Sequence, residues 1–576
     1  MATMQDPKNR PRVALPQGTV VGVTQHGAYP NPVDAFLGVP YAQPPTGDLR
    51  FRPPVKVAKA APGEEEKIID ASQFGPRAPA KQFLIIGPKL EESEDCLTAN
   101  VFRQAGAAAA TGEKGSKKLL PVAIYMHGGA FNRGNAAMHD TASMVGWSAA
   151  PFVAVSFGYR IGALGFLPSG LSAKEGALNL GLKDQILMME WVQENIHLFG
   201  GDKDNVTLIG LSAGAHSIGH HLLNYEEGKP PLFHRIVMES GAPTSRAVRH
   251  FDAEIHEQQF RDFLAAVNCP QDTPESGIFP YLRSLPIDAI AAAQTKVFYE
   301  YNPSLRWAFQ PVIDGEIIRQ RPIDAWRKGQ WHKMPILTGF NGNEGSLYVD
   351  KQMRTPEQFT AFWKTLLPQL SDANVATINE LYPDPTGPDA ASSKYRVEGA
   401  LKEKGGVGAM YKRIEAAYAH YAYVAPARQT AELAGAQGVP VYLYHWALEK
   451  TLVNGAAHGE NMLYEVRDPG VCGVSPAQDE LSRVLHAYVT SFICTGDPNG
   501  GVEDGDGVER PRWEAHSNGD RGTKVKMVFG KGNKEFVGGD SDGKSQSPPP
   551  LAELVEDVWA KTESDFWWDK VEISQQ

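Results

Sequence analysis

The chain has 576 residues and a formal net charge of −11, with acidic and basic residues mixed along its length. No run of about 18 apolar residues is present to span a membrane, and no basic cluster predicts nucleic-acid binding. Length alone allows three or four domains. The motifs below are spread over the whole chain, however, and favour a single domain at residues 14–570 after a polar tail at residues 1–13.

The first chemical motif follows an apolar segment at residues 119–126, which predicts a buried strand. The sequence His-Gly-Gly-Ala-Phe comes next, at residues 127–131. Adjacent glycines allow bare backbone to approach a ligand, so the N–H groups of Gly128 and Gly129 are candidate donors to an oxyanion. Phe131 is a candidate pocket residue. An ordinary glycine-rich loop is the alternative interpretation.

The second motif is Gly-Leu-Ser-Ala-Gly at residues 210–214, after an apolar run at residues 205–209. The order strand, tight turn and helix presents a serine on strained backbone with its hydroxyl exposed. Ser212 is therefore the candidate nucleophile, and the N–H of Ala213 is a third oxyanion donor. Because the chain contains 57 glycines, such a pattern also arises by chance, and a buried structural serine is the alternative.

A nucleophilic serine needs an acid and a base, which follow it in this order in proteins with such a turn. Residues 334–340 predict another buried strand, and Glu344 lies just beyond it, where the strand's carboxyl end can present a carboxylate. Residues 441–446 predict a further strand, and His458 follows on a loop of small residues. Glu344 is the candidate acid and His458 the candidate base.

Three other histidines are less suitable as the base. His216 and His220 lie on the helix that begins at the candidate nucleophile, so their side chains are poorly placed to reach the Ser212 hydroxyl. His445 lies inside a predicted strand, which favours a structural role.

Together these motifs resemble the type-B carboxylesterase family, which includes cholinesterases and lipases. The resemblance extends from about residue 14 to about residue 545. Further matching segments are residues 36–45, 93–101, 158–167, 179–185, 199–202, 239–242 and 311–315. The family implies an α/β-hydrolase fold, in which a large, mostly parallel central sheet is flanked by helices and insertions form a gorge.

The resemblance also implies a mechanism that uses no metal or organic cofactor. Ser212, Glu344 and His458 would form a triad that cleaves carboxylic esters through an acyl-enzyme. Gly128, Gly129 and Ala213 would form the oxyanion hole, and Ser240 would support the acid.

Two departures from the family bear on the substrate. Leu211 stands where the family usually has a glutamate, and the loop at residues 78–95 has Phe83 as its only aromatic residue. A cationic substrate needs an aromatic face or an anion. We therefore expect neutral esters of small to medium size rather than choline esters.

Three functions stay open at this point. The first is a soluble esterase, and the second is a lipase acting on longer-chain acylglycerols, for which the apolar segment at residues 83–86 is a candidate lid or simply a packed loop. The third is a catalytically silent adhesion or scaffold homologue, although all three triad residue types are present. The sequence leaves the oligomeric state open.

The cysteines and the N-terminus predict the compartment. In secreted relatives the positions of Cys96 and Cys269 have bridging partners, whereas Ala78 and Tyr281 stand at the partner positions here. Sparse unpaired cysteines are typical of a reducing compartment, and the polar N-terminus shows no signal peptide. We therefore expect a cytoplasmic protein.

Overall fold

The computed structural model describes residues 10–60, 67–81, 87–107, 119–388, 390–500, 507–517, 523–537 and 550–574. The candidate lid at residues 83–86 lies outside this part of the chain. The expected tail is shorter than predicted, because β1 (Arg12–Leu15) pairs with β2 (Gly18–Val21) in a small sheet with β5 (Ile68–Asp70). At the other end, α19 (Val571–Ser574) extends past the expected boundary at 570.

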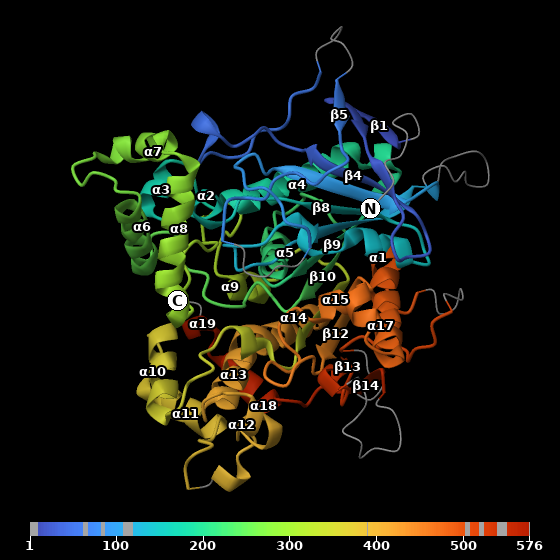
Figure 1. The fold of residues 1–576 in the computed structure, drawn as a ribbon. Helices are drawn as coiled ribbons and strands as arrows, with labels where there is room; N and C mark the ends of the chain where they lie inside the picture. The colour runs from blue at the N-terminus through green and yellow to red at the C-terminus, as the bar shows by residue number, and fades with distance from the viewer. Residues whose placement is uncertain are drawn as a thin grey trace.

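The described residues form an 11-stranded sheet with the strand order β14-β13-β12-β11-β10-β9-β7-β8-β6-β4-β3 (Figure 1). The strands from β8 to β13 in this order are parallel, and the remaining strands at both edges are antiparallel. The strands are β3 (Val23–Gln25), β4 (Val33–Pro40), β6 (Thr98–Gln104), β7 (Leu120–Met126), β8 (Val153–Phe157), β9 (Gly201–Leu211), β10 (Arg235–Glu239), β11 (Ile336–Asn341), β12 (Val441–Trp446), β13 (Val525–Phe529) and β14 (Ala552–Glu556). The predicted α/β architecture is confirmed. This sheet takes strands from residue 23 to residue 556, and the single-domain division stays a prediction.

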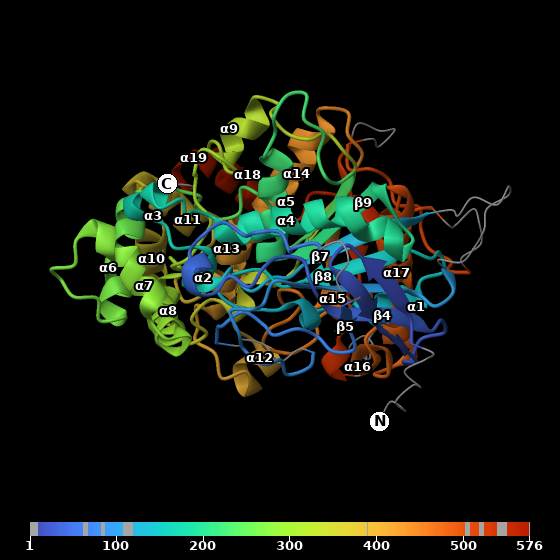
Figure 2. The same cartoon turned by 90° about the horizontal axis from the view of Figure 1, so that it is seen from above.

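Both faces of the central strands are buried, which explains their almost continuous apolar sequences. In β7, Ile124 faces the layer formed by α4 (Leu180–Asn195), α5 (Ala213–Leu223) and α14 (Ala425–Gly435). Its neighbour Tyr125 faces the opposite layer, formed by α1 (Thr141–Trp147) and α17 (Pro476–Thr495). Figure 2 shows α4, α5 and α14 along one side and α1 along the other.

Further helices extend this frame beyond the sheet. They are α2 (Gly162–Gly165), α3 (Gly170–Lys174), α6 (Glu254–Ala266), α7 (Glu275–Ser284), α8 (Ile287–Tyr301), α9 (Pro322–Arg327), α10 (Pro356–Leu366), α11 (Asp372–Leu381), α12 (Gly399–Lys404), α13 (Tyr411–Ala419), α15 (Asn461–Glu465), α16 (Pro469–Cys472) and α18 (Lys561–Asp569). Helices α10, α11 and α13 enclose an aromatic-rich core of their own. None of the described helices combines the length and apolar content needed to cross a bilayer.

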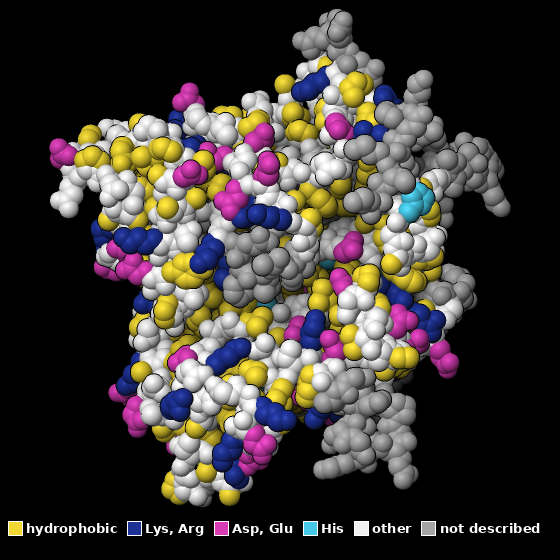
Figure 3. All heavy atoms as spheres, in the orientation of Figure 1, with side chains coloured by type: hydrophobic (Ala, Val, Ile, Leu, Met, Phe, Trp, Pro, Cys, Tyr) yellow, Lys and Arg dark blue, Asp and Glu magenta, His cyan; other side chains and the backbone are white. Residues whose placement is uncertain are grey.

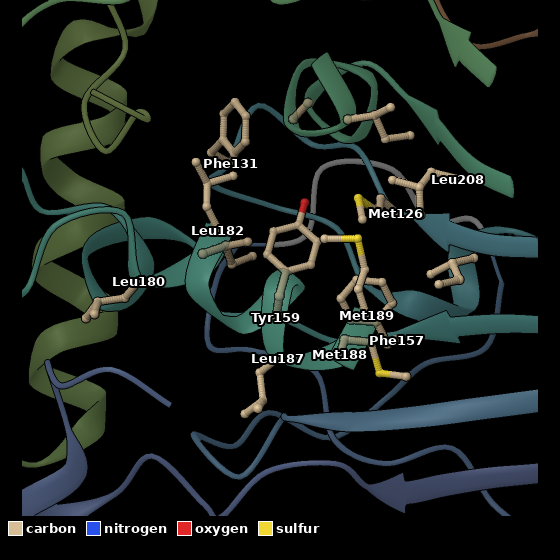
Figure 4. Packing of buried hydrophobic residues seen from close by; sticks show 14 of the residues in the cluster. Met126, Phe131, Phe157, Tyr159, Leu180, Leu182, Leu187, Met188, Met189 and Leu208 are labelled. Atoms are coloured by element: carbon tan, nitrogen blue, oxygen red, sulfur yellow. The ribbon is translucent and has the colours of Figure 1, made fainter. Parts of the chain in front are cut away.

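The core beneath β7 also holds the loop that follows this strand. Figure 4 shows Tyr159 near Leu182 and Met189, with Phe131 close to Leu182. The Tyr159 hydroxyl donates a hydrogen bond of 2.7 Å to the carbonyl of His127, and the two rings stack with centroids 4.2 Å apart. The first residue of the glycine motif is therefore fixed to the packed core.

Candidate active site

Ser212 lies on a strained turn between β9 and α5. Its backbone has φ 58° and ψ −122°, a conformation that non-glycine residues rarely adopt. Its N–H donates to the carbonyl of Glu239, and its own carbonyl accepts from His216, both at 2.9 Å. A Cβ at Gly214 would lie 2.0 Å from the carbonyl oxygen of Met126, so only glycine lets the helix start this close to β7.

The glycine loop lies directly against this turn. A Cβ at Gly128 would be 3.1 Å from the Cβ of Ser212 and 2.7 Å from the carbonyl oxygen of Leu211. Gly129 has φ +118°, and a Cβ there would lie 2.2 Å from the carbonyl oxygen of Arg133. Within the described chain, the N–H groups of Gly128 and Gly129 donate no hydrogen bond to other residues. Two unbonded backbone donors therefore lie beside the candidate nucleophile.

Polar side chains hold the rest of this loop in place. Ala130 and Phe131 both have positive φ, at 56° and 61°. The carbonyl of Ala130 accepts hydrogen bonds of 2.9 Å from the side chains of Asn132 and Gln310. The Phe131 ring is 3% exposed, so most of it belongs to the core, and its role in a substrate pocket stays a prediction.

The structure brings Glu344 and His458 together, although 113 residues separate them in the sequence. Oε2 of Glu344 lies 2.5 Å from Nδ1 of His458, and its Oε1 accepts the N–H of Asn341 at 2.6 Å. Glu344 is fully buried, and the His458 side chain is 8% exposed. Nε2 of His458 is shielded from solvent and makes no hydrogen bond in the described part of the chain, including with Ser212.

Leu211 connects the nucleophile turn to the histidine loop. A Cβ at Gly459 would lie 2.9 Å from Cδ2 of Leu211, so the leucine side chain packs against the residue after His458. Leu211, which replaces the glutamate usual in the family, thus makes an apolar contact next to His458.

Ser240 does not hydrogen bond to Glu344. It has φ 49° and is fully buried, and its Oγ has no hydrogen-bond partner among the described residues. Glu415 supports the acid loop instead, since its carboxylate accepts from the Asn343 side chain at 3.1 Å and the Gly345 N–H at 3.2 Å. Burial raises the pKa of Glu415 to about 7. The support that we predicted for Ser240 stays a prediction.

Two tyrosine rings surround the imidazole of His458. The centroid of Tyr423 is 4.7 Å away, and that of Tyr348 is 5.3 Å away in an edge-on arrangement. Tyr423 lies on a π-helical turn (His420–Val424) between α13 and α14. Sequence reasoning missed both tyrosines, because they come from separate segments and no spacing in the sequence indicates which aromatic side chains face the site.

A pair of buried carboxyl groups lies beneath the nucleophile turn. Oε1 of Glu239 accepts a hydrogen bond of 2.5 Å from the side chain of Asn461, and the Tyr444 hydroxyl is 3.5 Å away. Burial raises the pKa of Glu239 to about 7 and raises that of neighbouring Glu465 well above its usual range. Burial therefore favours the protonated form of both carboxyl groups at this position.

The histidines assigned to structural roles lie as expected. His216 and His220 are buried on α5, and burial lowers the pKa of His220 to about 3. His445 is buried in β12 against Trp559, with ring centroids 4.5 Å apart. Among the described residues, no cluster of three or more histidine, cysteine, aspartate or glutamate side chains is arranged to hold a metal ion.

Comparisons with known proteins agree with this geometry. Residues 9–531 match the Carboxylesterase family. The chain is 32% identical over 524 residues to "Secreted lipase 4" of Gibberella zeae, covering 90% of this chain and 88% of the relative. It is 30% identical over 560 residues to "Secreted triacylglycerol lipase LIP1" of the same organism, covering 91% and 87%.

A solved structure shows the same fold. EstA of Aspergillus niger superposes with a TM-score of 0.78 at 24% identity, covering 99% of this chain and 100% of EstA. At this identity the likeness supports the fold alone.

The expectation of a cytoplasmic location is wrong. The two Gibberella zeae relatives are named as secreted proteins, which points to secretion. The four cysteines are free, including Cys96 and Cys269, whose family partner positions carry Ala78 and Tyr281. A missing bridge is nevertheless a poor guide to the compartment, because a core of this size does not need disulfides for stability.

The match over most of the chain, the shared fold and the relatives named as lipases lead to one conclusion: this chain belongs to the carboxylesterase family and is a carboxylic ester hydrolase.

Proposed function

We propose that Ser212 attacks the ester carbonyl while His458 removes its proton through Nε2. Glu344 holds the imidazole through Nδ1 and stabilises the imidazolium that forms. The observation that carries this proposal is the 2.5 Å contact between Glu344 and His458, which leaves Nε2 free beside the strained serine turn. In the absence of substrate, the bond between base and nucleophile is often longer than in the complex.

The tetrahedral intermediate places a negative charge on the former carbonyl oxygen. The N–H groups of Gly128, Gly129 and Ala213 are the proposed donors to this oxygen, and each is worth roughly 3 kcal/mol of barrier. The alcohol leaves with the proton from His458, and water then cleaves the acyl-enzyme by the same steps in reverse.

The test is hydrolysis of 4-nitrophenyl butyrate by the wild type, Ser212→Ala and Ser217→Ala. Ser217 is a matched control on the same helix, where its hydroxyl bonds to the Ala213 carbonyl at 3.0 Å. We expect Ser212→Ala to lose activity by about 10⁴-fold or more and to resist labelling by a fluorophosphonate, while Ser217→Ala keeps both properties. Equal rates for the wild type and Ser212→Ala would refute the assignment.

Neutral esters are the proposed basal substrates. Leu211 places an apolar side chain beside the imidazole, where a negative charge would favour a cationic alcohol such as choline. A choline ester hydrolysed faster than the matched neutral ester of 3,3-dimethylbutanol would contradict this part of the proposal.

A lipase is the second candidate, because the relatives include "Lipase 1" of Geotrichum candidum, 28% identical over 548 residues, as well as the two secreted lipases. A rate that rises sharply above the solubility limit of a long-chain ester would favour this function. A strong preference for dissolved acetate or butyrate esters would exclude it.

A further inference from the structure

Arg246 lies one aromatic ring away from the candidate base and has no acidic partner among the residues that the structure describes. Its guanidinium carbon is 4.1 Å from the ring centre of Trp307 and within 6 Å of the rings of Tyr348 and Tyr423. Nη2 donates a hydrogen bond of 2.7 Å to the Tyr423 hydroxyl. The same two tyrosine rings contact His458. These rings therefore lie between the imidazole and the guanidinium.

Most of the hydrogen-bonding capacity of Arg246 is unused. Nε and Nη1 are shielded from solvent and make no well-formed hydrogen bond in the described part of the chain, where the Tyr418 hydroxyl is a further neighbour of the guanidinium. These atoms carry three of the five N–H groups of a guanidinium, and arginine cannot lose its charge at neutral pH. A shielded cation without an anion is strongly unfavourable, so the free donors indicate a missing acceptor.

The cavity next to Arg246 contains two more arginines. Arg249 and Arg306 line it together with Trp307, and the cavity is small, about 40 Å³, and partly open to solvent. Burial lowers the pKa of Arg249 to about 10, which leaves it charged at neutral pH. We call Arg246, Arg249 and Arg306 the arginine pocket.

No carboxylate balances these charges. Among the described residues, none of the three arginines forms an ion pair. His256 also lines the cavity, but burial lowers its pKa to about 3, so it is neutral and adds no charge. On the face seen in Figure 3, by contrast, basic and acidic side chains are interspersed. An excess of positive charge is therefore concentrated in the arginine pocket.

The arginine pocket is connected to the catalytic residues on two sides. Through Tyr423 and Tyr348 it adjoins His458. Through the segment that carries Trp307 it adjoins the oxyanion loop, because the Gln310 side chain donates to the Ala130 carbonyl at 2.9 Å. The arginine pocket therefore adjoins both the candidate base and the oxyanion loop.

We propose that the arginine pocket binds a carboxylate carried by the ester substrate, so that the preferred substrates are half-esters of dicarboxylic acids or related acidic esters. The inference rests on the proposed function, since it assigns part of the substrate of that site. A guanidinium presents its N–H groups as a planar fork that matches a carboxylate, which a neutral ester lacks.

The first test compares two matched substrates on the wild type. One is 4-nitrophenyl hydrogen glutarate, and the other is its methyl ester, which has nearly the same shape without the charge. We expect kcat/KM for the acid to exceed that for the methyl ester by at least tenfold. Succinate and adipate homologues then locate the chain length at which the carboxylate reaches the pocket.

The second test measures how the ratio of the two kcat/KM values changes in variants. We expect Arg246→Met to lower the ratio at least tenfold and Arg246→Lys to lower it less, because a lysine keeps the charge without the fork. The ratio is insensitive to a general loss of folded enzyme. Arg327→Gln is the control, since Arg327 is half exposed and pairs with Glu572 far from the site.

The outcomes separate the two proposals. If the wild type hydrolyses the methyl ester through Ser212 but shows no preference for the acid, the inference fails and the proposed function stands. If free glutarate changes the rate on the methyl ester while the acid is no better a substrate, the pocket binds a separate anion and the inference also fails. If neither ester is hydrolysed, both proposals are overturned.

Discussion

Buried charges in this protein belong to two groups, one with partners of opposite charge and one without. Arg160 is 2% exposed and binds both carboxylate oxygens of Asp184, at 2.9 and 2.6 Å. Arg428 does the same with Asp557, at 2.8 and 2.5 Å. The first pair joins residues 24 positions apart in the chain, and the second joins residues 129 positions apart.

Three buried groups without an ion-pair partner among the described residues lie near the active site. Glu239 lies beneath the nucleophile turn and Glu415 behind the acid loop, and burial raises the pKa of each to about 7. A carboxyl group can thus avoid the unfavourable buried charge by keeping its proton. Arg246 cannot do so, which is why the same shortage of partners suggests a ligand only in its case.

The largest expected effect comes from a charged pair within the site itself. Glu344→Gln keeps the shape of the acid but removes the charge that favours the reactive tautomer of His458 and its imidazolium. We expect kcat to fall by about 10⁴-fold, as for the equivalent change in other serine triads. Steady-state kinetics with 4-nitrophenyl butyrate measure this loss. A loss below tenfold would show that another group orients His458.

The next effect compares a paired arginine with an unpaired one. Arg160→Met leaves Asp184 buried without its cation, which costs about 3–5 kcal/mol of unfolding free energy. Arg246→Met leaves no carboxylate behind. It removes a contact with aromatic rings worth about 1–2 kcal/mol but also relieves the cost of a shielded charge, so its net loss should be smaller than that of Arg160→Met. Equilibrium urea unfolding of both variants at pH 7 gives the two values.

The double variant Arg160→Met/Asp184→Leu is the control for this comparison, because it removes both charges and should recover part of the loss. If Arg246→Met were as destabilising as Arg160→Met, the guanidinium would have a structural role, and the contrast between the two groups would disappear.

The sequence predicted the parts of the site that depend on local backbone. The turn at Ser212 and the loop at Gly128 and Gly129 were recognisable because their conformations require glycine at fixed spacing. The strand at residues 441–446 was predicted with its observed limits, since a buried parallel strand is almost continuously apolar.

The parts that depend on long-range packing were not predictable. Arg246, Tyr348 and Tyr423 come from three separate segments, and no spacing in the sequence indicates that they meet. Glu415 from α13 accepts hydrogen bonds from Asn343 and Gly345 on the loop that carries Glu344, a contact that no sequence pattern indicates, and the role of Ser240 stays a prediction. The pattern of a single sequence indicates which face of a helix or strand is buried. It does not indicate which residues of other elements pack against that face.

The smallest expected effect tests the carboxyl groups without partners. Because the pKa of Glu239 is raised from 4.5 to about 7 in the folded state, folding favours its protonated form. The associated stability is fully present below about pH 4.5 and is lost as the pH rises through 7. Glu239→Gln keeps the neutral shape at every pH, and its side-chain oxygen can still accept from Asn461.

We therefore expect the unfolding free energy of Glu239→Gln, relative to the wild type, to rise by about 2 kcal/mol between pH 5 and pH 8. Urea unfolding at several pH values measures the difference, with Glu227→Gln at an exposed position as the control. A difference that falls with pH would mean that Glu239 is ionised in the folded protein. An ionised Glu239 would need a cation nearby, just as Arg246 needs an anion. The acids and the arginine near the site would then no longer differ in whether they can lose their charge.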